Sequence, residues 1–245
     1  MKIVIVSDIH ANLAAIRSLP EDDYDQLWCL GDLVDYGPHP HETIRWIMTH
    51  ATALVRGNHD HAVGFAGTPE ACALFRGLAA ATRQCTHEVC TKRDLDFLRE
   101  LPLRKEMIVD GTRFHLVHAS PSDPLFGYFP EDSDQWVGEV QKIDADVLLV
   151  GQTHKPFIRK IDNCIIANPG SIGQPKTGRP LACYAVWEDG QIILKEYEYP
   201  IEETIADISQ MSISERDRQA LISILLPREF AGSRTEAGQL LAHHS

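Results

Sequence analysis

Short apolar runs alternate with stretches of helical periodicity along the first sixty residues. The apolar runs are KIVIV at residues 2–6, DQLWCL at residues 25–30 and the strand-like part of ATALVRGNHD at residues 51–60. Between them, the spacing of apolar residues predicts a short helix over residues 13–19, stopped by Pro20, and a second helix over residues 42–50. This βαβαβ order predicts a parallel sheet, and such sheets bind ligands at the carboxyl ends of their strands.

The rest of the chain continues as helices, then strands, then helices again. Residues 68–101 read as helical, with a start at Thr68-Pro69 and a capping-box entry at Thr91 and Asp94. Two hairpins are predicted, over residues 106–118 around Asp110-Gly111 and over residues 181–199. Between them, strands are predicted at residues 145–150 and 164–168. From Ile201 the pattern is helical again, with a capped start at Ser214 and a stop at Pro227.

Composition places the chain among globular proteins. Its 245 residues, 44% hydrophobic and 24% charged, suffice for one large domain or two small ones. The formal net charge of -12 makes long nucleic acid a poor partner, because an acidic surface repels phosphate backbones. The N-terminus turns polar too soon for a signal peptide, and no apolar run approaches membrane length. We therefore expect a soluble cytoplasmic protein without a membrane partner.

Polar side chains that can bind metals follow five separate apolar segments. They are Asp8 and His10, Asp32 and Asp35, Asn58 and His59, His118, and His154 at the end of the sequence GQTH. One metal-competent residue after an apolar segment is weak evidence of a binding site, whereas five such segments in succession indicate one. Mixed oxygen and imidazole donors suit manganese, iron or zinc better than calcium. Two such ions about 3.5–4 Å apart can acidify a bridging water and stabilise a displacement at phosphorus.

The motifs DIH, GDLVD, GNHD, His118 and GQTH stand in the order of the calcineurin-like metallophosphoesterase superfamily. The sequence resembles this family over residues 1 to about 200, and SDIHANLAAI, GDLVDYGP, RGNHD and NPGSIGQP make it most similar to the small prokaryotic phosphodiesterases. The resemblance implies an α/β (α+β) fold, a four-layer α-β-β-α sandwich of two mixed sheets flanked by helices. We expect residues 1–200 to form the metallophosphoesterase domain and residues 201–245 a C-terminal helical extension with a frayed tail.

The resemblance also implies a role for each motif residue. A first metal ion is held by Asp8, His10 and His154, a second by Asn58 and His118, and Asp32 bridges both. His59 faces the substrate, where it stabilises the transition state or protonates the leaving oxygen, and Asp35 orients it. Asn12 and Asn168 are expected to bind phosphate oxygens or to support the ligands.

Two positions depart from the family pattern. The family usually has histidine at position 152, whereas Gln152 offers only a neutral amide oxygen, so we expect Gln152 to be a weaker ligand of the second metal. Tyr36 stands at the substrate side, where related protein phosphatases carry an arginine that binds phosphate. The missing charge disfavours a phosphoprotein substrate, although Arg56 or a cation within residues 155–179 could supply it.

These observations predict a metal-dependent phosphoesterase that hydrolyses a phosphodiester or a small nucleotide-type phosphoester through a metal-bound hydroxide. The expected cofactors are two divalent ions, manganese in preference to iron or zinc, with a second site weakened by Gln152. The partner is a small phosphoester substrate, and a homo-oligomer is left open. Two alternatives remain: a serine/threonine phosphoprotein phosphatase, suggested by GDLVDYGP, and a non-catalytic scaffold of the same fold, suggested by Gln152. The retained His59 and Asp35 favour an enzyme.

Overall fold

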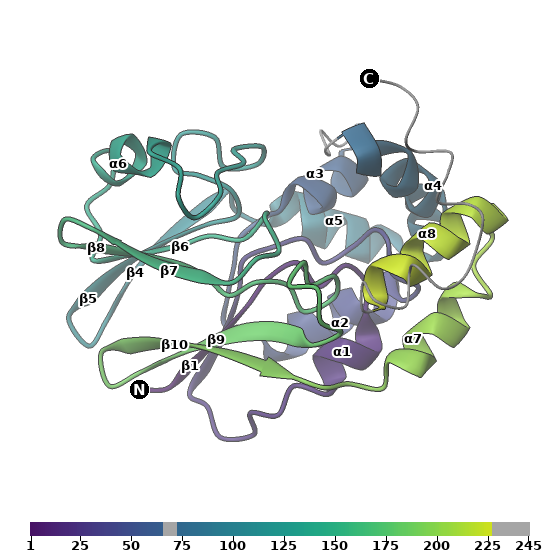
Figure 1. Ribbon diagram of the computed structural model, residues 1–245, viewed down its shortest axis with the longest axis horizontal. Coiled ribbons are helices and arrows are strands. Elements are labelled where there is room, and N and C mark those ends of the chain that lie inside the picture. Colours follow the sequence, from purple (N-terminus) through teal and green to yellow (C-terminus); the bar gives the residue numbers. More distant parts are fainter. Residues whose placement is uncertain (66–72, 227–245) are drawn as a thin grey trace.

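The computed structural model describes residues 1–65 and 73–226, and two mixed five-stranded sheets form its centre (Figure 1). The first sheet has the order β10-β9-β1-β2-β3, with β1 (Ile3–Val6), β2 (Gln26–Cys29), β3 (Ala53–Leu54), β9 (Ala182–Glu188) and β10 (Gln191–Tyr197). The second has the order β4-β5-β6-β8-β7, with β4 (Arg104–Val109), β5 (Thr112–Val117), β6 (Val147–Leu149), β7 (Phe157–Ile161) and β8 (Cys164–Asn168). Strands β1, β2 and β3 are parallel to one another, as are β5, β6 and β8.

Helices cover the outer faces of both sheets. The outer face of the first sheet packs against α1 (Leu13–Arg17), α2 (Pro40–His50) and α5 (Lys92–Glu100), and that of the second packs against α6 (Gln135–Val140). The other helices of the described residues are α3 (Asn58–Gly64), α4 (Ala73–Val89), α7 (Ile201–Ile208) and α8 (Glu215–Leu225). In Figure 1, α6 lies on the outer side of the second sheet, apart from the other helices. None of the helices in the described part of the chain has the length and hydrophobicity needed to cross a lipid bilayer.

The hydrophobic core has the layers that the predicted fold requires. Along β1, Ile3 and Ile5 pack between the two sheets, whereas Val4 and Val6 pack against apolar residues of α1, α2 and α5. This alternation follows from the pleat of a strand that is buried on both faces. A third cluster, built around Trp136 of α6, covers the outer face of the second sheet. The four layers are therefore helix, sheet, sheet and helix, which confirms the predicted fold class.

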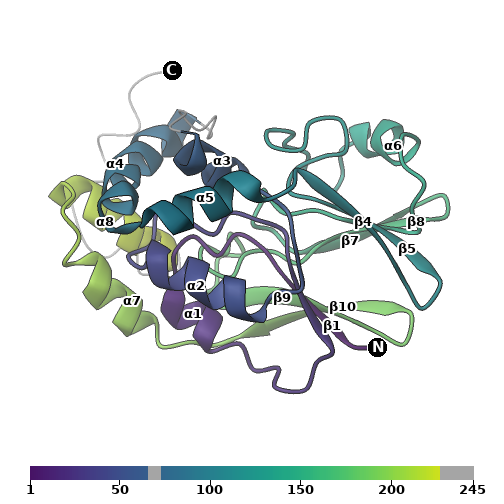
Figure 2. The same ribbon diagram turned by 180° about the vertical axis from the view of Figure 1, so that it is seen from behind.

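A fourth apolar cluster joins the two C-terminal helices to α4. Ile208 of α7 and Leu221 and Leu225 of α8 pack against Leu78 of α4 and against Tyr36, which follows β2. Figure 2, seen from behind, agrees with Figure 1 that α8 lies beside α4. The segment after residue 200 thus packs on the helix α4 and on one of the predicted site residues. The division of the chain at residue 200 stays a prediction.

Most predicted elements are present in the described part of the chain. Thr91 caps α5 with Asp94 in the predicted capping box, and Asp110-Gly111 turns the predicted hairpin. The predicted helix start at Thr68-Pro69, the stop at Pro227 and the frayed tail lie outside the described residues. Among the described residues, three elements were not predicted: β7, α6, and α3, which begins at Asn58 within the GNHD motif.

Candidate metal centre

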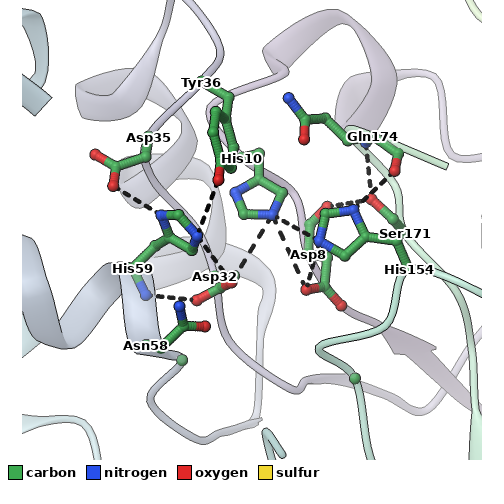
Figure 3. Close-up of polar contacts among 12 residues, drawn as sticks. Asp8, His10, Asp32, Asp35, Tyr36, Asn58, His59, His154, Ser171 and Gln174 are labelled. Carbon is green, nitrogen blue, oxygen red and sulfur yellow. Dashed lines mark hydrogen bonds and ion pairs between the residues drawn. The ribbon is translucent and has the colours of Figure 1, made fainter. Parts of the chain in front are cut away.

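The structure brings the predicted site residues together from loops that are far apart in the sequence (Figure 3). Asp8 and His10 follow β1, Asp32 and Asp35 follow β2, Asn58 and His59 begin α3, His118 follows β5, and His154 follows β6. All eight side chains are buried. Because the parallel strands of both sheets point the same way, their following loops meet at one edge of the sandwich.

Asp8, His10 and His154 form the first candidate group, with donor atoms within 4.8 Å of one another. The two imidazoles face each other through Nε2 atoms 3.1 Å apart. Their Nδ1 atoms lie 3.0 Å and 2.8 Å from the carbonyl oxygens of Val34 and Gln174, so each ring carries its proton on Nδ1. Burial lowers the pKa of His10 to about 3 and, together with Lys176, lowers that of His154. Two neutral rings therefore direct lone pairs at the same point.

Asp32 and His118 form the second group, which shares Asp8 with the first. His118 Nε2 lies 3.3 Å from Asp32 Oδ2 and 3.2 Å from Asn58 Oδ1. Asp32 Oδ2 also lies 3.8 Å from His10 Nε2, so this carboxylate reaches both groups. Burial opposes a charge on His118, but Asp32 outweighs it and raises the pKa of the ring to about 10. Burial alone would raise the pKa of Asp32. The nearby His118 and His59 outweigh this effect and hold the pKa of Asp32 well below its usual range.

The donor set fits divalent cations. Both carboxylate oxygens of Asp8 are buried and have no hydrogen-bond partner among the described residues. A buried carboxylate without donors is costly unless a cation compensates its charge, and two opposed imidazole lone pairs repel each other unless a cation lies between them. Carboxylate, amide and imidazole ligands are those that manganese, iron and zinc accept. A first ion would be held by Asp8, His10 and His154, and a second by Asp32, Asn58 and His118.

His59 lies beside this cluster with its ring held at both nitrogens. Its Nδ1 is 2.8 Å from Asp35 Oδ2, and its Nε2 is 3.4 Å from the Tyr36 hydroxyl and 4.0 Å from Asp32 Oδ2 (Figure 3). Burial disfavours the charged ring, but Asp32 and the hydrogen-bonded Asp35 raise the pKa of His59 above its usual value. An imidazole held in this way can donate a proton from Nε2 towards the metal groups.

The remaining predicted residues lie at the edge of the cluster or support it. Asn168 donates to the carbonyl of Gly151 at 2.5 Å and to Thr153 Oγ1 at 3.1 Å, so it holds the GQTH loop. Gln152 lies in that loop, half-buried, and no hydrogen bond to its side chain occurs among the described residues. Its contact with a metal therefore stays a prediction.

Asn12, which was expected to bind phosphate oxygens or to support the ligands, makes four hydrogen bonds within the protein. Its Oδ1 accepts from the Ala15 backbone and the Thr204 hydroxyl, and its Nδ2 donates to the Gly173 carbonyl and the Tyr199 hydroxyl. These four bonds use the hydrogen-bonding capacity of the amide. Asn12 therefore caps α1 and ties it to α7, which corresponds to the supporting role rather than to substrate binding.

Asp60 supports the site, and no role was predicted for it. This fully buried carboxylate accepts hydrogen bonds from the backbone N–H groups of Asp32, Leu33 and Gly57, at 2.8, 2.8 and 3.0 Å. Burial and the nearby Asp32 raise the pKa of Asp60 to about 6. The carboxylate fixes the backbone on which Asp32 stands. Its place at the end of GNHD was the available signal, since a charged residue directly after buried motif residues is itself expected to be buried and to need partners.

Arg83 is a second supporting residue for which the sequence predicted no role. It comes from the middle of α4 and forms an ion pair with Asp35 through Nη2. No sequence motif marks this position. Arg56, one of the cations considered for the site, instead donates to the carbonyl of Arg99 at 2.8 Å and lies over the ring of Phe65. Arg83 is thus the arginine that the fold brings to the site.

The loops hold strained backbone conformations. Among the described residues, eight of the eleven non-glycine residues with positive φ are Asp8, His10, Ala11, Asp32, Asp35, Tyr36, Gln152 and His154. Such conformations persist where surrounding contacts determine them, and they concentrate at functional sites. The loops also approach closely, because a Cβ added at Gly57 would lie 2.0 Å from Asp32 Oδ1. Close packing of strained loops preorganises the ligand cluster.

Comparisons with known proteins agree with this geometry. A sequence model of the calcineurin-like phosphoesterase superfamily domain matches residues 1–189. An uncharacterized protein of Methanocaldococcus jannaschii is 31% identical over 236 residues, covering 87% of this chain and 94% of that protein. A symmetrical bis(5'-nucleosyl)-tetraphosphatase of Methylobacillus flagellatus is 49% identical over 61 residues, covering 23% of this chain and 22% of that protein. The crystal structure of a metallophosphoesterase from Sphaerobacter thermophilus superposes with a TM-score of 0.78 at 28% identity, covering 92% of this chain and 99% of that one.

Proposed function

This chain belongs to the calcineurin-like phosphoesterase superfamily and is a phosphoric ester hydrolase, and we propose that it acts as a metal-dependent phosphodiesterase on small nucleotide-type phosphoesters. The observation that carries the proposal is the pair of neutral imidazoles, His10 and His154, whose Nε2 atoms lie 3.1 Å apart beside the Asp8 carboxylate. Such an arrangement is stable around a cation and unfavourable without one.

We propose two divalent ions, manganese in preference to iron or zinc, held by the two groups that meet at Asp8 and Asp32. Ions in this arrangement would acidify a water molecule and stabilise the charge that develops at phosphorus. The chain itself contributes the buried carboxylates and imidazoles that fix the ligand geometry. Gln152 is proposed as a weak ligand of the second ion, because an amide oxygen carries no charge.

His59 is the proposed general acid. Its Nε2 is the ring atom that faces the ligand cluster, and its Nδ1 is held by Asp35 at 2.8 Å. A ring oriented in this way can stabilise the charged transition state or donate a proton to the departing oxygen. The Tyr36 hydroxyl, 3.4 Å from His59 Nε2, is proposed to border the bound substrate. A non-catalytic scaffold has no need of the His59–Asp35 pair, so its presence favours catalysis.

Two observations support a small ester over a phosphoprotein. The chain is locally similar to a symmetrical bis(5'-nucleosyl)-tetraphosphatase, a protein that is named for a nucleotide substrate. Tyr36 occupies the position after Asp35 with a neutral side chain, and the nearby Arg83 is already paired with Asp35. Because no arginine among the described residues is placed to bind phosphate here, a phosphomonoester with two negative charges is bound less favourably than a diester with one.

Hydrolysis of bis-p-nitrophenyl phosphate by the chelator-treated protein, with and without added Mn²⁺, tests the proposal. We expect turnover only with the metal, and a higher kcat/KM for the diester and for a dinucleoside polyphosphate than for a phosphoserine peptide. A preference for the peptide supports the phosphoprotein phosphatase instead. Folded protein that is inactive with every divalent ion and all three substrates supports the scaffold.

A further inference from the structure

Two consecutive residues of α4 hold two consecutive residues of the site loop. The Tyr36 backbone N–H donates to Thr82 Oγ1 at 3.0 Å, and Arg83 Nη2 is ion-paired with Asp35 Oδ2. Asp35 and Tyr36 have φ angles of 64° and 65°, which are strained for non-glycine residues. Helix α4 therefore holds the loop at two residues whose backbone conformation is unfavourable.

One oxygen atom connects Arg83 with His59. Asp35 Oδ2 receives both the Arg83 guanidinium and the His59 Nδ1–H, the latter at 2.8 Å. The Asp35 side chain is 0% exposed and that of Arg83 is 10% exposed, so solvent screens this pair little. Because a planar guanidinium donates in fixed directions, it determines the orientation of the carboxylate as well as balancing its charge.

The orientation of His59 depends on that carboxylate. With Nδ1 fixed on Asp35, the ring directs Nε2 towards Asp32 Oδ2 and the Tyr36 hydroxyl (Figure 3). A rotation of Asp35 would turn the ring and move the Nε2 proton away from the departing oxygen. Partners of this kind, which touch no substrate, contribute by keeping the catalytic group in its productive rotamer.

We propose that Arg83 is a positioning residue that fixes the Asp35 carboxylate and thereby aims His59 at the leaving group. The proposal rests on the proposed function, since it assigns a role within the same reaction. It differs from a direct role in phosphate binding, because Arg83 acts here through Asp35 and His59. It also links the activity to helix α4, which lies outside the metal-binding motifs.

The leaving-group dependence of hydrolysis tests the proposal in the manganese-loaded full chain. Wild type, Arg83→Met and Arg83→Lys are assayed on a series of aryl phosphodiesters whose leaving phenols differ in pKa. We expect Arg83→Met to lower kcat on the order of 10–100-fold, with a larger loss for poor leaving groups and KM little changed. Arg83→Lys should recover part of the loss. Arg93→Met, which removes an exposed arginine of α5, is the matched control and should behave as wild type.

A double-mutant cycle separates positioning from general stabilisation. If Arg83 acts through His59, Arg83→Met should change kcat little in a His59→Asn background, because coupled residues are not additive. A rise in KM at constant kcat, an equal loss across all leaving groups, or full additivity in the cycle overturns the proposal. If Arg83→Met does not fold, Arg83→Lys gives the same comparison. A wild-type protein without activity overturns the proposed function itself, whereas an active wild type with unaffected Arg83 variants overturns only this inference.

Discussion

The Nε2 atoms of His10 and His154 lie 3.1 Å apart, and neither ring has a proton to place between them. Their Nδ1 protons are used on the carbonyl oxygens of Val34 and Gln174, and burial keeps both rings neutral. The Asp8 carboxylate, which accepts no hydrogen bond among the described residues and whose Oδ1 lies 3.3 Å from His154 Nε2, completes the group. The folded chain thus holds three acceptors around one point, and this repulsive arrangement should be stable when a cation occupies that point.

Metal removal should therefore destabilise the protein. We expect chelation to lower Tm and Mn²⁺ to restore it, with a stabilisation of about 3 kcal/mol at a hundredfold excess of metal over its Kd. Thermal unfolding followed by circular dichroism measures the effect. His154→Ala is the control, since it removes one ligand and should reduce the shift. An unchanged Tm with and without chelator in the wild type contradicts the prediction.

Metal binding should release protons from His118. Asp32 raises the pKa of this ring to about 10, against the effect of burial, so the metal-free site holds a proton on Nε2 at neutral pH. A metal bound at Nε2 must displace that proton, and the apparent affinity should rise with pH, up to about tenfold per pH unit. Calorimetric titration with Mn²⁺ in PIPES and in Tris measures the proton release. Equal binding enthalpies in the two buffers, after correction for metal–buffer binding, speak against it.

Loss of the His59 ring should affect catalysis but not metal binding. We expect His59→Asn to lower kcat about 10²–10⁴-fold, the usual contribution of a general acid. Metal content and Tm should stay close to those of wild type, because the ring lies beside the ligand cluster rather than within it. Kinetics on bis-p-nitrophenyl phosphate and metal analysis of the same preparation measure both. A variant that retains full activity would remove His59 from the mechanism.

Replacing Gln152 should strengthen the second metal site. The variant Gln152→His introduces an imidazole at a backbone position with φ 65°, a region that histidine tolerates better than most residues. We expect a lower Kd for the second Mn²⁺ or Zn²⁺, by about tenfold, the scale on which site partners alter metal affinity. Metal titration resolves the two binding steps. An unchanged second Kd would mean that residue 152 points away from the ion.

The four layers were expected from the resemblance to the calcineurin-like family, whereas the strands and the loops that carry the candidate ligands could be predicted from local patterns. The β-branched run before Asp8 and the apolar run before Asp32 form parallel neighbours, and parallel strands deliver their following loops to the same edge. The capping box of Thr91 and Asp94 likewise involves residues three apart, and it formed as predicted. Candidate metal ligands could be proposed because each of these polar residues lies within a few residues of the end of a strand.

The contacts that hold the site could not be predicted in this way, because they join segments distant in sequence. Arg83 reaches Asp35 across 48 residues, and nothing in the helical pattern of α4 distinguishes it from a solvated arginine. Strand β7 was not predicted because its five residues, FIRKI, form neither a continuous apolar run nor a regular alternation of apolar and polar residues. Asn12 carries a side chain typical of phosphate contacts, and only the fold reveals that Thr204 and Tyr199 use its amide.

Anomalous scattering from a manganese-loaded crystal would show whether the buried cluster binds metal ions. We expect two anomalous peaks about 3.5–4 Å apart, one enclosed by Asp8, His10 and His154 and the other by Asp32, Asn58 and His118. The height of the second peak reports how strongly Gln152 limits occupancy. If saturating Mn²⁺ leaves no peak between the His10 and His154 rings, this group of residues is not a metal site.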